Sequence, residues 1–354
     1  MGVVIGCPVV RTAPYWVTTD ELIADMEARY AESGQLDWRH LKMLRQTSIE
    51  KRPWIAPIEE TAALRGVGAR SRAAYAGARD LAVAAAADAL ERSGLNPEDV
   101  DCLVTTHTAT WTVPGLDVDL VALLGLRPQV SRIGLATVAC SGGGHALVQA
   151  ARFVRAEPGK RVLVVAAEPL STLYNPLSGP PTLQSVIYGG LFGDAAAAAV
   201  VADVPVGGGR SLVVKGTWEF VLPNSADAYW GVYEETGIAF DSGPQAPTAP
   251  SRILPYLKEW LGERPVGWAA VHPGGPRIIS GTLAGLGLEE EAAGRHARDS
   301  LTRGNLGGVA LLDVLARSLA DGDPVRGWGT AVAFGPGFTG SGLYLWAQDR
   351  GEDG

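Results

Sequence analysis

Cys140 lies between an apolar, strand-like run and an alanine-rich stretch, and three glycines follow Ser141. The run covers residues 133–138, and the composition predicts a helix over 146–154. A cysteine on a strand-to-helix turn lies near the positive end of the helix dipole, which stabilises a thiolate. Glycines, lacking a Cβ, let an acyl chain and the backbone approach the sulfur. Cys140 is therefore a candidate nucleophile. The alternative is a small buried residue, because free cysteine is among the most buried residue types.

Two further residues could act with Cys140. His272, one of five histidines, follows a short apolar strand at 268–271 and precedes a Pro-Gly-Gly turn, and parallel α/β folds place their chemistry at such strand ends. Asn305 follows a glycine and heads an apolar helix predicted over 306–319, where its amide could instead serve as the N-cap. A histidinium can hold a cysteine as thiolate. His272 and Asn305 could also donate two hydrogen bonds to a thioester oxygen, which stabilises the enolate formed when a malonyl group loses carbon dioxide.

Composition limits the class of protein. The 354 residues are 47% hydrophobic and 19% charged, as in a globular protein with two cores or one large duplicated domain. A formal net charge of −8 argues against nucleic acid or an anionic membrane as the main partner. Cys7, Cys102 and Cys140 share no CxxC spacing, which disfavours a disulfide framework or a metal site and favours a reducing cytoplasm. We expect a soluble cytoplasmic protein, because no signal peptide and no apolar run of ~18 residues is evident.

Alternating apolar strands and helices predict an α/β protein whose sheets are mostly parallel and covered by helices on both faces. The predicted helices cover residues 18–31, 38–49, 71–93, 116–124 and 253–260, and the predicted strands cover 101–106, 161–167, 194–202, 211–220, 330–334 and 342–346. The glycine-rich stretch 204–210 is the best boundary between two halves. We place the Cys-bearing half at 1–204 and the half with His and Asn at 205–354. Residues 222–250 are predicted to be irregular.

Four motifs, in order, resemble the type III polyketide synthases (the chalcone synthase family), which have the thiolase fold. The resemblance runs from about Thr18 to Trp346. The motifs are Leu-Phe-Gly-Asp-Ala-Ala at 191–196, Trp-Ala-Ala-Val-His-Pro-Gly-Gly-Pro at 268–276, Gly-Asn-Leu at 304–306, and Phe-Gly-Pro-Gly-Phe at 334–338, with Ala333 in place of the family's first glycine. The resemblance implies a thiolase-like fold with two similar βαβαβ-type halves that form a layered αβαβα core.

The resemblance also implies an activity, that of an acyltransferase in polyketide biosynthesis. Cys140 would hold a starter acyl group and then the growing chain. His272 and Asn305 would bind the malonyl thioester carbonyl and drive its decarboxylation, and His272 would also keep Cys140 ionised. The substrates would be a starter acyl-CoA and malonyl-CoA, with no permanently bound cofactor and no metal. A homodimer is implied, and an acyl carrier protein is a further candidate partner.

Several basic residues fall where the family contacts the coenzyme A phosphates. Arg39 and Lys42 match two such positions, and Arg277 is a third candidate. A further family position holds uncharged Gln46. Neighbouring cations that could take over that contact are Arg45 and Lys51. A charge cluster of this kind, which continues into Arg52, is more often only a solvated face.

Other positions match the family's cavity. Phe192 would help to separate the coenzyme A tunnel from the cavity. Ile238 falls at the second gatekeeper, which is normally phenylalanine, so a differently shaped and wider entrance is predicted; Phe240 follows two residues later. Val113, with Pro114, corresponds to a loop that reaches into the partner's cavity across a homodimer. The remaining residues expected to line the cavity are Thr106, His107 and Trp111.

The leading hypothesis is a type III polyketide synthase that performs iterative decarboxylative Claisen condensation of malonyl-CoA and cyclises the product in the same cavity. A ketosynthase III-like enzyme that performs one round on carrier-bound malonate is the alternative, and the His-Pro-Gly-Gly sequence at 272–275 disfavours it. The intact set of Cys140, His272 and Asn305 disfavours a non-catalytic partner subunit. A cysteine hydrolase is disfavoured because no carboxylate motif that would orient the base is apparent. The starter, the number of extensions and the mode of cyclisation stay open.

Overall fold

The computed structural model describes residues 2–31, 34–320 and 324–348. Its main sheet has ten strands, with the order β12-β13-β14-β9-β1-β8-β7-β5-β6 and with β2 beside β8. Their bounds are Val3–Gly6 (β1), Val9–Thr12 (β2), Cys102–His107 (β5), Ser131–Ala136 (β6), Val162–Glu168 (β7), Ala195–Ala202 (β8), Ser211–Val221 (β9), Trp268–Val271 (β12), Gly327–Gly335 (β13) and Thr339–Gln348 (β14). Two small sheets accompany it, formed by Tyr15–Thr18 (β3) with Lys51–Trp54 (β4) and by Tyr229–Glu234 (β10) with Gly237–Ser242 (β11).

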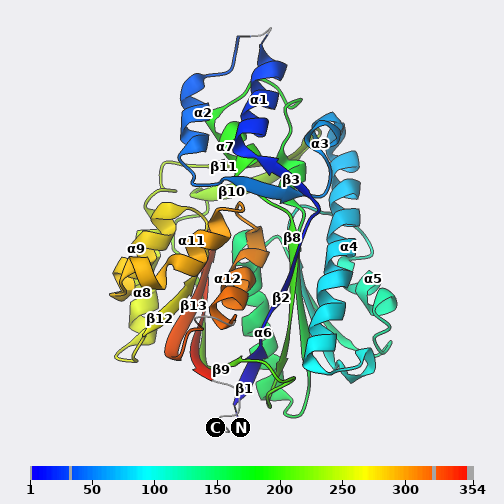
Figure 1. Cartoon of the computed structure of the whole chain (residues 1–354), viewed down its shortest axis with the longest axis vertical. Coiled ribbons are helices and arrows are strands. Elements are labelled where there is room, and N and C mark those ends of the chain that lie inside the picture. Colours follow the sequence, from blue (N-terminus) through cyan, green and yellow to red (C-terminus); the bar gives the residue numbers. More distant parts are fainter. Residues whose placement is uncertain (1, 32–33, 321–323, 349–354) are drawn as a thin grey trace.

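Helices cover the outer faces of this sheet and also lie between its two parts (Figure 1). Their bounds are Thr19–Tyr30 (α1), Trp38–Arg45 (α2), Ile58–Ala63 (α3), Gly66–Ser93 (α4), Leu116–Leu123 (α5), Gly142–Ala156 (α6), Leu183–Leu191 (α7), Ala249–Leu261 (α8), Pro276–Leu286 (α9), Glu290–Ala293 (α10), Arg295–Leu301 (α11) and Ala310–Leu319 (α12). Short 3-10 helices are Pro97–Asp99 (η1), Ala139–Ser141 (η2), Leu170–Leu173 (η3) and Gly307–Val309 (η4). Within these described residues, no helix is long and apolar enough to cross a membrane.

The central layer consists of α6 and α12. Helix α6 contacts β5 and β7 on one side and β13 and β14 on the other, and α12 likewise contacts both β8 and β12. Helices α4 and α5 lie outside one part of the sheet, and α8 and α9 lie outside the other (Figure 1). Strand β8 is built of alanine and valine and is buried along its whole length, because helices approach it from both faces. The layered αβαβα core expected from the sequence is present.

The two halves repeat one pattern of strand pairing. In the first half β5 is parallel to β7, β7 antiparallel to β8, and β8 antiparallel to β1. In the second half β12 is parallel to β13, β13 antiparallel to β14, and β14 antiparallel to β9. Helix α6 precedes β7 as α12 precedes β13, and β1 pairs with β9 to join the halves. The expectation of mostly parallel sheets is wrong, since most of the described pairings are antiparallel. The boundary at residue 204 falls between β8 and β9 and stays a prediction.

Some element predictions need correction. Residues 222–250 are not irregular: they contain the β10–β11 hairpin, whose β10 strand is largely exposed and so shows no apolar alternation. Helix α8 starts at Ala249, so Pro255 lies inside it and not in its first turn. Helix α2 ends at Arg45, and Ser48 beyond it has a φ of 65°. Helix α7 was not predicted.

Three glycines let α6 approach its neighbours closely, and two of them face the second half. A Cβ on Gly143 would lie 2.2 Å from the carbonyl oxygen of Gly308, and one on Gly144 would lie 2.1 Å from Oγ of Ser341. A Cβ on Gly142 would lie 2.5 Å from Oγ1 of Thr106. We expected these glycines to leave room for an acyl chain, but they face protein atoms. They also lie inside α6, which begins four residues before the predicted helix.

We predict that Gly143→Ala destabilises the protein by about 2–4 kcal/mol, because the new methyl group would meet backbone that cannot move aside. Urea unfolding measures the change. The matched control is Gly281→Ala, also inside a helix, where a Cβ meets nothing within 4 Å. That control should stabilise by about 0.5–1 kcal/mol. If both variants unfold at the same urea concentration, the close contact does not limit the packing of α6.

Candidate active site

Cys140 lies in η2, on the tight turn between β6 and α6. Two residues that precede it have left-handed backbone, Thr137 with a φ of 63° and Ala139 with a φ of 48°. Such conformations cost roughly 1–2 kcal/mol each in residues other than glycine, and they cluster at functional sites. The Cys140 side chain is half-buried and packs against an apolar cluster that includes Leu170 and Phe192. The turn therefore presents a sulfur at the N-terminus of a buried helix.

Asn305 is the residue that the structure places on the sulfur. Its Nδ2 donates a hydrogen bond to Sγ of Cys140 over 3.7 Å, and its Oδ1 accepts one from the N–H of Gly307 over 2.9 Å. The second contact fixes which end of the amide faces the thiol. The backbone of Asn305 is also held, because its N–H donates to the carbonyl of Leu191 and its carbonyl accepts from Gly193. The N-cap of η4 is Leu306 and not Asn305; the Asn305 oxygen instead accepts from the first residue of η4, and its nitrogen faces the sulfur.

His272 lies at the end of β12 and is 2% exposed. Its backbone N–H donates to the carbonyl of Val332, while its ring Nδ1 is buried without a hydrogen-bond partner. A Cβ on Gly274 would lie 3.0 Å from Nε2, so this glycine lets the backbone fold back beside the ring. Among the described residues, no hydrogen bond joins His272 to Cys140. The imidazole is thus placed in the interior but is not paired.

Burial favours the uncharged form of both Cys140 and His272. It raises the pKa of Cys140 to about 12, with a smaller contribution from the charge of Glu168, and the hydrogen bond from Asn305 opposes this rise. Burial also lowers the pKa of His272 to about 4. A neutral imidazole keeps a lone pair with which it can accept the thiol proton. The ion pair of Cys140 thiolate and His272 imidazolium expected from the sequence stays a prediction.

Glu168 is a buried carboxyl that the sequence analysis did not single out. Its Oε1 accepts hydrogen bonds from Oγ1 of Thr108 over 2.9 Å and from the N–H of Gly308 over 3.4 Å, whereas Oε2 has no partner. Burial raises its pKa to about 8, so the carboxyl is largely protonated at neutral pH. An acidic residue that ends the otherwise apolar strand β7 was the signal that could have revealed it.

The predicted cavity residues fall in different places. Thr106 is fully buried beneath the first glycine of α6. The ring of His107 hydrogen-bonds to Thr110, and burial lowers its pKa. Trp111 is 66% exposed and lines an open groove of about 540 Å³, and Val113 is 93% exposed. Trp111 and Val113 are therefore exposed on the surface of the chain.

The gatekeeper region contains three aromatic rings. The ring centroids of Phe192 and Phe240 are 6.0 Å apart. Tyr188 stacks on Phe192 at 6.2 Å and lies 6.3 Å from Phe240. Ile238 packs against the same apolar cluster. Position 238 therefore holds an isoleucine, as expected, but the neighbouring Phe240 places an aromatic ring in the gatekeeper region.

The candidate coenzyme A residues are all exposed. Arg39 and Lys42 lie on α2, and Arg277 lies in the first turn of α9. Arg39 pairs with Asp37 at 2.6 Å, so a phosphate would compete with this carboxylate. Arg52 does not belong to an exposed cluster, because its side chain is fully buried in β4.

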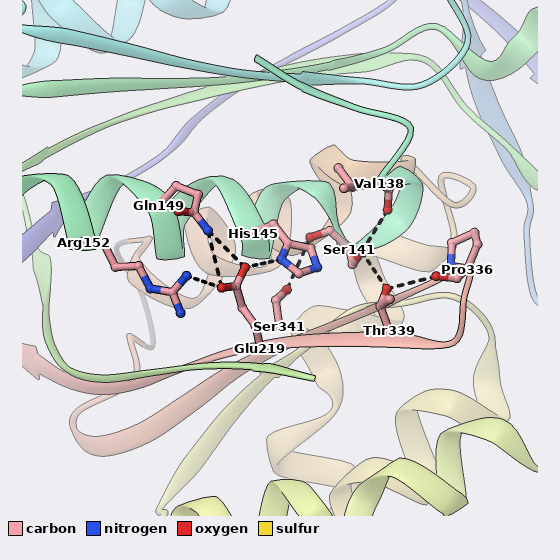
Figure 2. Close-up of polar contacts among 9 residues, drawn as sticks. All are labelled: Val138, Ser141, His145, Gln149, Arg152, Glu219, Pro336, Thr339 and Ser341. Carbon is pink, nitrogen blue, oxygen red and sulfur yellow. Dashed lines mark hydrogen bonds and ion pairs between the residues drawn. The ribbon is translucent and has the colours of Figure 1, made fainter. Parts of the chain in front are cut away.

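Glu219 in the second half contacts one side of α6, the helix that follows Cys140. Figure 2 shows His145, Gln149 and Arg152 of α6 converging on Glu219 of β9. Oε1 of Glu219 lies 2.6 Å from Nδ1 of His145 and accepts from Nε2 of Gln149 over 3.2 Å, and Oε2 pairs with Arg152. The three partners occupy one helix face, so a single carboxylate ties α6 to β9 across two turns.

The start of α6 is tied to the same half. Oγ of Ser141 donates to the carbonyl of Val138 over 2.9 Å and lies 3.2 Å from Oγ1 of Thr339 (Figure 2). Oγ of Ser341 donates to the carbonyl of Ser141 over 3.3 Å. These contacts from β14 fix the turn next to Cys140.

The structure also bears on metals and disulfides. All three cysteines are free. Within the described part of the chain, no group of three or more His, Cys, Asp or Glu side chains could hold a metal ion.

The chain is similar to known proteins of one family, both in sequence and in structure. Residues 21–205 match the family described as chalcone and stilbene synthases, N-terminal domain. The chain is 32% identical to type III polyketide synthase 21 of Oryza sativa subsp. japonica, over 75% of this chain and 71% of that protein. It is 29% identical to a 1,3,6,8-tetrahydroxynaphthalene synthase of Streptomyces griseus, over 84% and 81% of the two chains. Germicidin synthase from Streptomyces coelicolor, a type III polyketide synthase, superposes with a TM-score of 0.91 at 28% identity, covering 98% of this chain and 100% of that chain.

We predict that Glu168→Gln raises the reactivity of Cys140 towards iodoacetamide at high pH. Near pH 9 the Glu168 carboxyl, with a pKa of about 8, is ionised and repels the thiolate, so its removal lowers the pKa of Cys140. A lower pKa leaves more of Cys140 as thiolate at this pH, so the alkylation rate should rise by about threefold to tenfold. At about pH 6 Glu168 is protonated, and the two proteins should react alike.

Peptide mapping resolves Cys140 from the other two cysteines. Exposed Glu259→Gln is the matched control and should leave the rate unchanged at either pH. Equal rates for Glu168→Gln and the unaltered protein at high pH would contradict electrostatic coupling between Glu168 and Cys140.

Proposed function

The chain belongs to the chalcone and stilbene synthase family, the type III polyketide synthases, and from this premise we propose that it extends a starter acyl group by iterative decarboxylative condensation with malonyl-CoA. It is an acyltransferase with a thiolase-like fold. One observation supports the chemistry most directly: the Asn305 amide donates to the Cys140 sulfur over 3.7 Å in a buried site.

The loading step starts from a neutral Cys140 thiol and a neutral His272 imidazole. The Cys140 thiol gives its proton to His272, and the thiolate attacks the thioester carbonyl of the starter acyl-CoA. A sulfur–carbon bond to Cys140 forms, and the bond to the coenzyme A sulfur breaks. His272 returns the proton to the leaving thiolate, so the imidazole ends as it began.

The extension step uses the same imidazole with Asn305. Their N–H groups donate to the thioester oxygen of malonyl-CoA, and the bond to its carboxylate breaks to release carbon dioxide and leave an enolate. The enolate carbon attacks the acyl group on Cys140, which forms a carbon–carbon bond and frees the thiolate. The Cys140 thiolate then attacks the thioester carbonyl of the lengthened chain and releases coenzyme A, which permits another round. The loss of one such donor costs about 10²–10³ in rate.

Exposed cations and buried aromatic rings are the residues that we propose to contact the substrates. We propose that Arg39, Lys42 and Arg277 attract the coenzyme A phosphates, because they are exposed cations on a chain of net negative charge. Phe192 and Phe240 would separate the coenzyme A tunnel from the cavity, supported by their ring contact at 6.0 Å. A single round on a carrier-bound substrate is not favoured.

We also propose that the chain acts as a homodimer. Strand β6 ends the main sheet, and its residues are mostly exposed. Exposed apolar side chains gather in the neighbouring segments, including Trp111, Val113 and Leu123. Clusters of this kind mark interfaces, and the extreme exposure of Val113 fits a side chain that enters the partner's cavity. The free cysteines fit a reducing cytoplasm as the location.

A starter panel tests the activity. With malonyl-CoA and acyl-CoA starters, we expect release of carbon dioxide and condensed products by mass spectrometry. Cys140→Ala should abolish acyl loading and condensation, because no sulfur remains to carry the chain, and Cys140→Gln should retain decarboxylation. Carrier-bound malonate serves as the comparison substrate. Condensation by Cys140→Ala, or no product from the unaltered protein with any starter, would refute the proposal.

Val113→Asp tests the dimer, because it adds a charge to a surface that we expect to be buried. We expect the dimer dissociation constant to rise by about tenfold or more, equal to ~1.4 kcal/mol, measured by analytical ultracentrifugation. Val221→Asp is the matched control, since this valine is also exposed but lies in β9, away from that surface. A monomeric unaltered protein, or equal dimerisation of the two variants, would contradict the interface.

A further inference from the structure

A cavity of about 740 Å³ lies where the two halves meet, near the point at which β2 passes between α4 and α12 (Figure 1). Its lining comes from the turn between β1 and β2, the end of α4, the loop between β8 and β9, and α12. Small-molecule sites usually have volumes of roughly 300–1,000 Å³. The described lining includes none of Cys140, His272 and Asn305, so this cavity is separate from the candidate active site.

The described lining of this cavity is basic. It contains one carboxylate, that of Asp313, and four arginines, which are Arg92, Arg210, Arg303 and Arg317. Arg92 and Arg317 lie in the last turns of α4 and α12, where each helix dipole contributes roughly half a negative charge. After the carboxylate and both dipoles are counted, an excess of about two positive charges remains. A chain of net charge −8 therefore has a cavity that attracts anions.

Asp313 does not neutralise the two arginines that contact it. Nη2 of Arg303 donates to both oxygens of this buried carboxylate over 2.9 Å, and Nε of Arg317 donates to Oδ2 over 2.9 Å. Burial raises the pKa of Asp313, but the charges of the two arginines outweigh burial and lower it, so one negative charge faces two positive charges. The two arginine side chains are 26% and 27% exposed. Within the described residues, Nη1 of Arg303 and both Nη atoms of Arg317 make no hydrogen bond, so they are available to a ligand.

The α4 side of the cavity offers Arg92 and a glycine-rich loop. Arg92 is exposed, and within the described part of the chain its side chain makes no ion pair or hydrogen bond. A Cβ on Gly207, whose φ is 72°, would lie 2.3 Å from the carbonyl oxygen of Arg92, so this glycine lets the loop pack onto the end of α4. Gly208 and Gly209 line the cavity, and a Cβ on either would meet no atom within 4 Å. Their backbone is therefore accessible to a ligand.

We propose that this cavity binds a small organic molecule that carries two separate phosphate groups. One phosphate pairs with Arg303 and Arg317 beside α12, and the other pairs with Arg92 at the end of α4. Guanidinium groups suit this task, because their planar sets of N–H donors match phosphate oxygens in both geometry and charge. Apolar lining residues such as Val10 and Val206 contact the carbon body of the ligand. The inference goes beyond the proposed function and does not depend on it.

Isothermal titration calorimetry tests the ligand class with three probes, which are fructose 1,6-bisphosphate, fructose 6-phosphate and inorganic phosphate. We expect the bisphosphate to bind about tenfold or more tightly than either single phosphate, because only the bisphosphate reaches both groups of arginines. Added salt should weaken its binding, since the contacts are ionic. If the bisphosphate does not bind, or if a single phosphate binds as tightly, the proposed ligand class is wrong.

Three variants test the position of the site. Arg92→Gln and Arg317→Gln each remove one cation from a different side of the cavity, and each should weaken binding of the bisphosphate by about tenfold. Arg92 has no partner to lose, so its variant keeps the test available if Arg317→Gln does not fold. Arg39→Gln is the matched control, because it removes an exposed arginine from α2 and should leave binding unchanged. Weaker binding in Arg39→Gln with unchanged binding in Arg92→Gln would place the bisphosphate at α2 and overturn the inference.

A further measurement separates this cavity from the candidate active site. Arg92→Gln should retain condensation of acyl-CoA starters with malonyl-CoA at the rate of the unaltered protein, because Arg92 lies outside the residues proposed for that reaction. Loss of condensation together with loss of bisphosphate binding in a folded Arg92→Gln protein would mean that one site serves both, and would overturn the inference of a separate site.

Discussion

The contact on which the site depends is the approach of α6 to η4, where Gly143 meets the carbonyl of Gly308. Cys140 lies just before α6, and Asn305 lies just before η4, so the distance between these two backbone segments sets the distance between sulfur and amide. The contact leaves no room for a Cβ, and no side chain can adjust it. Catalytic geometry therefore follows from backbone packing between the halves and not from loops that move independently.

Much of the site could be predicted from local sequence. Cys140, His272 and Asn305 each combine a chemically active side chain with a strand or helix end, which one segment alone reveals. Glu168 and Tyr188 were missed because their surroundings come from segments distant in the chain: burial makes the carboxyl neutral, and the Tyr188 ring of α7 meets the Phe240 ring of β11. The position of Phe240 was likewise set by the β10–β11 hairpin, whose exposed residues gave no periodic signal.

Burial leaves the ionisable groups of the candidate site uncharged. The same desolvation raises the pKa values of Cys140 and Glu168 and lowers that of His272. In the proposed reaction, charge arises in two steps. The thiolate forms to attack a substrate carbonyl, and the enolate forms when the malonyl group loses its carboxylate as carbon dioxide. A site that is neutral at rest avoids the cost of a permanently buried ion pair, and in exchange a proton must move at the start of each cycle.

The pairing of β1 with both β8 and β9 has a consequence for synthesis of the chain. While the ribosome has made only the first half, β1 has one neighbour and its other edge is open to water and to other chains. Strand β9 covers that edge only after more than two hundred residues have been made. The halves repeat one architecture, yet the first is not complete as a folding unit until the second supplies its next strand, so a nascent chain benefits from a chaperone over that interval.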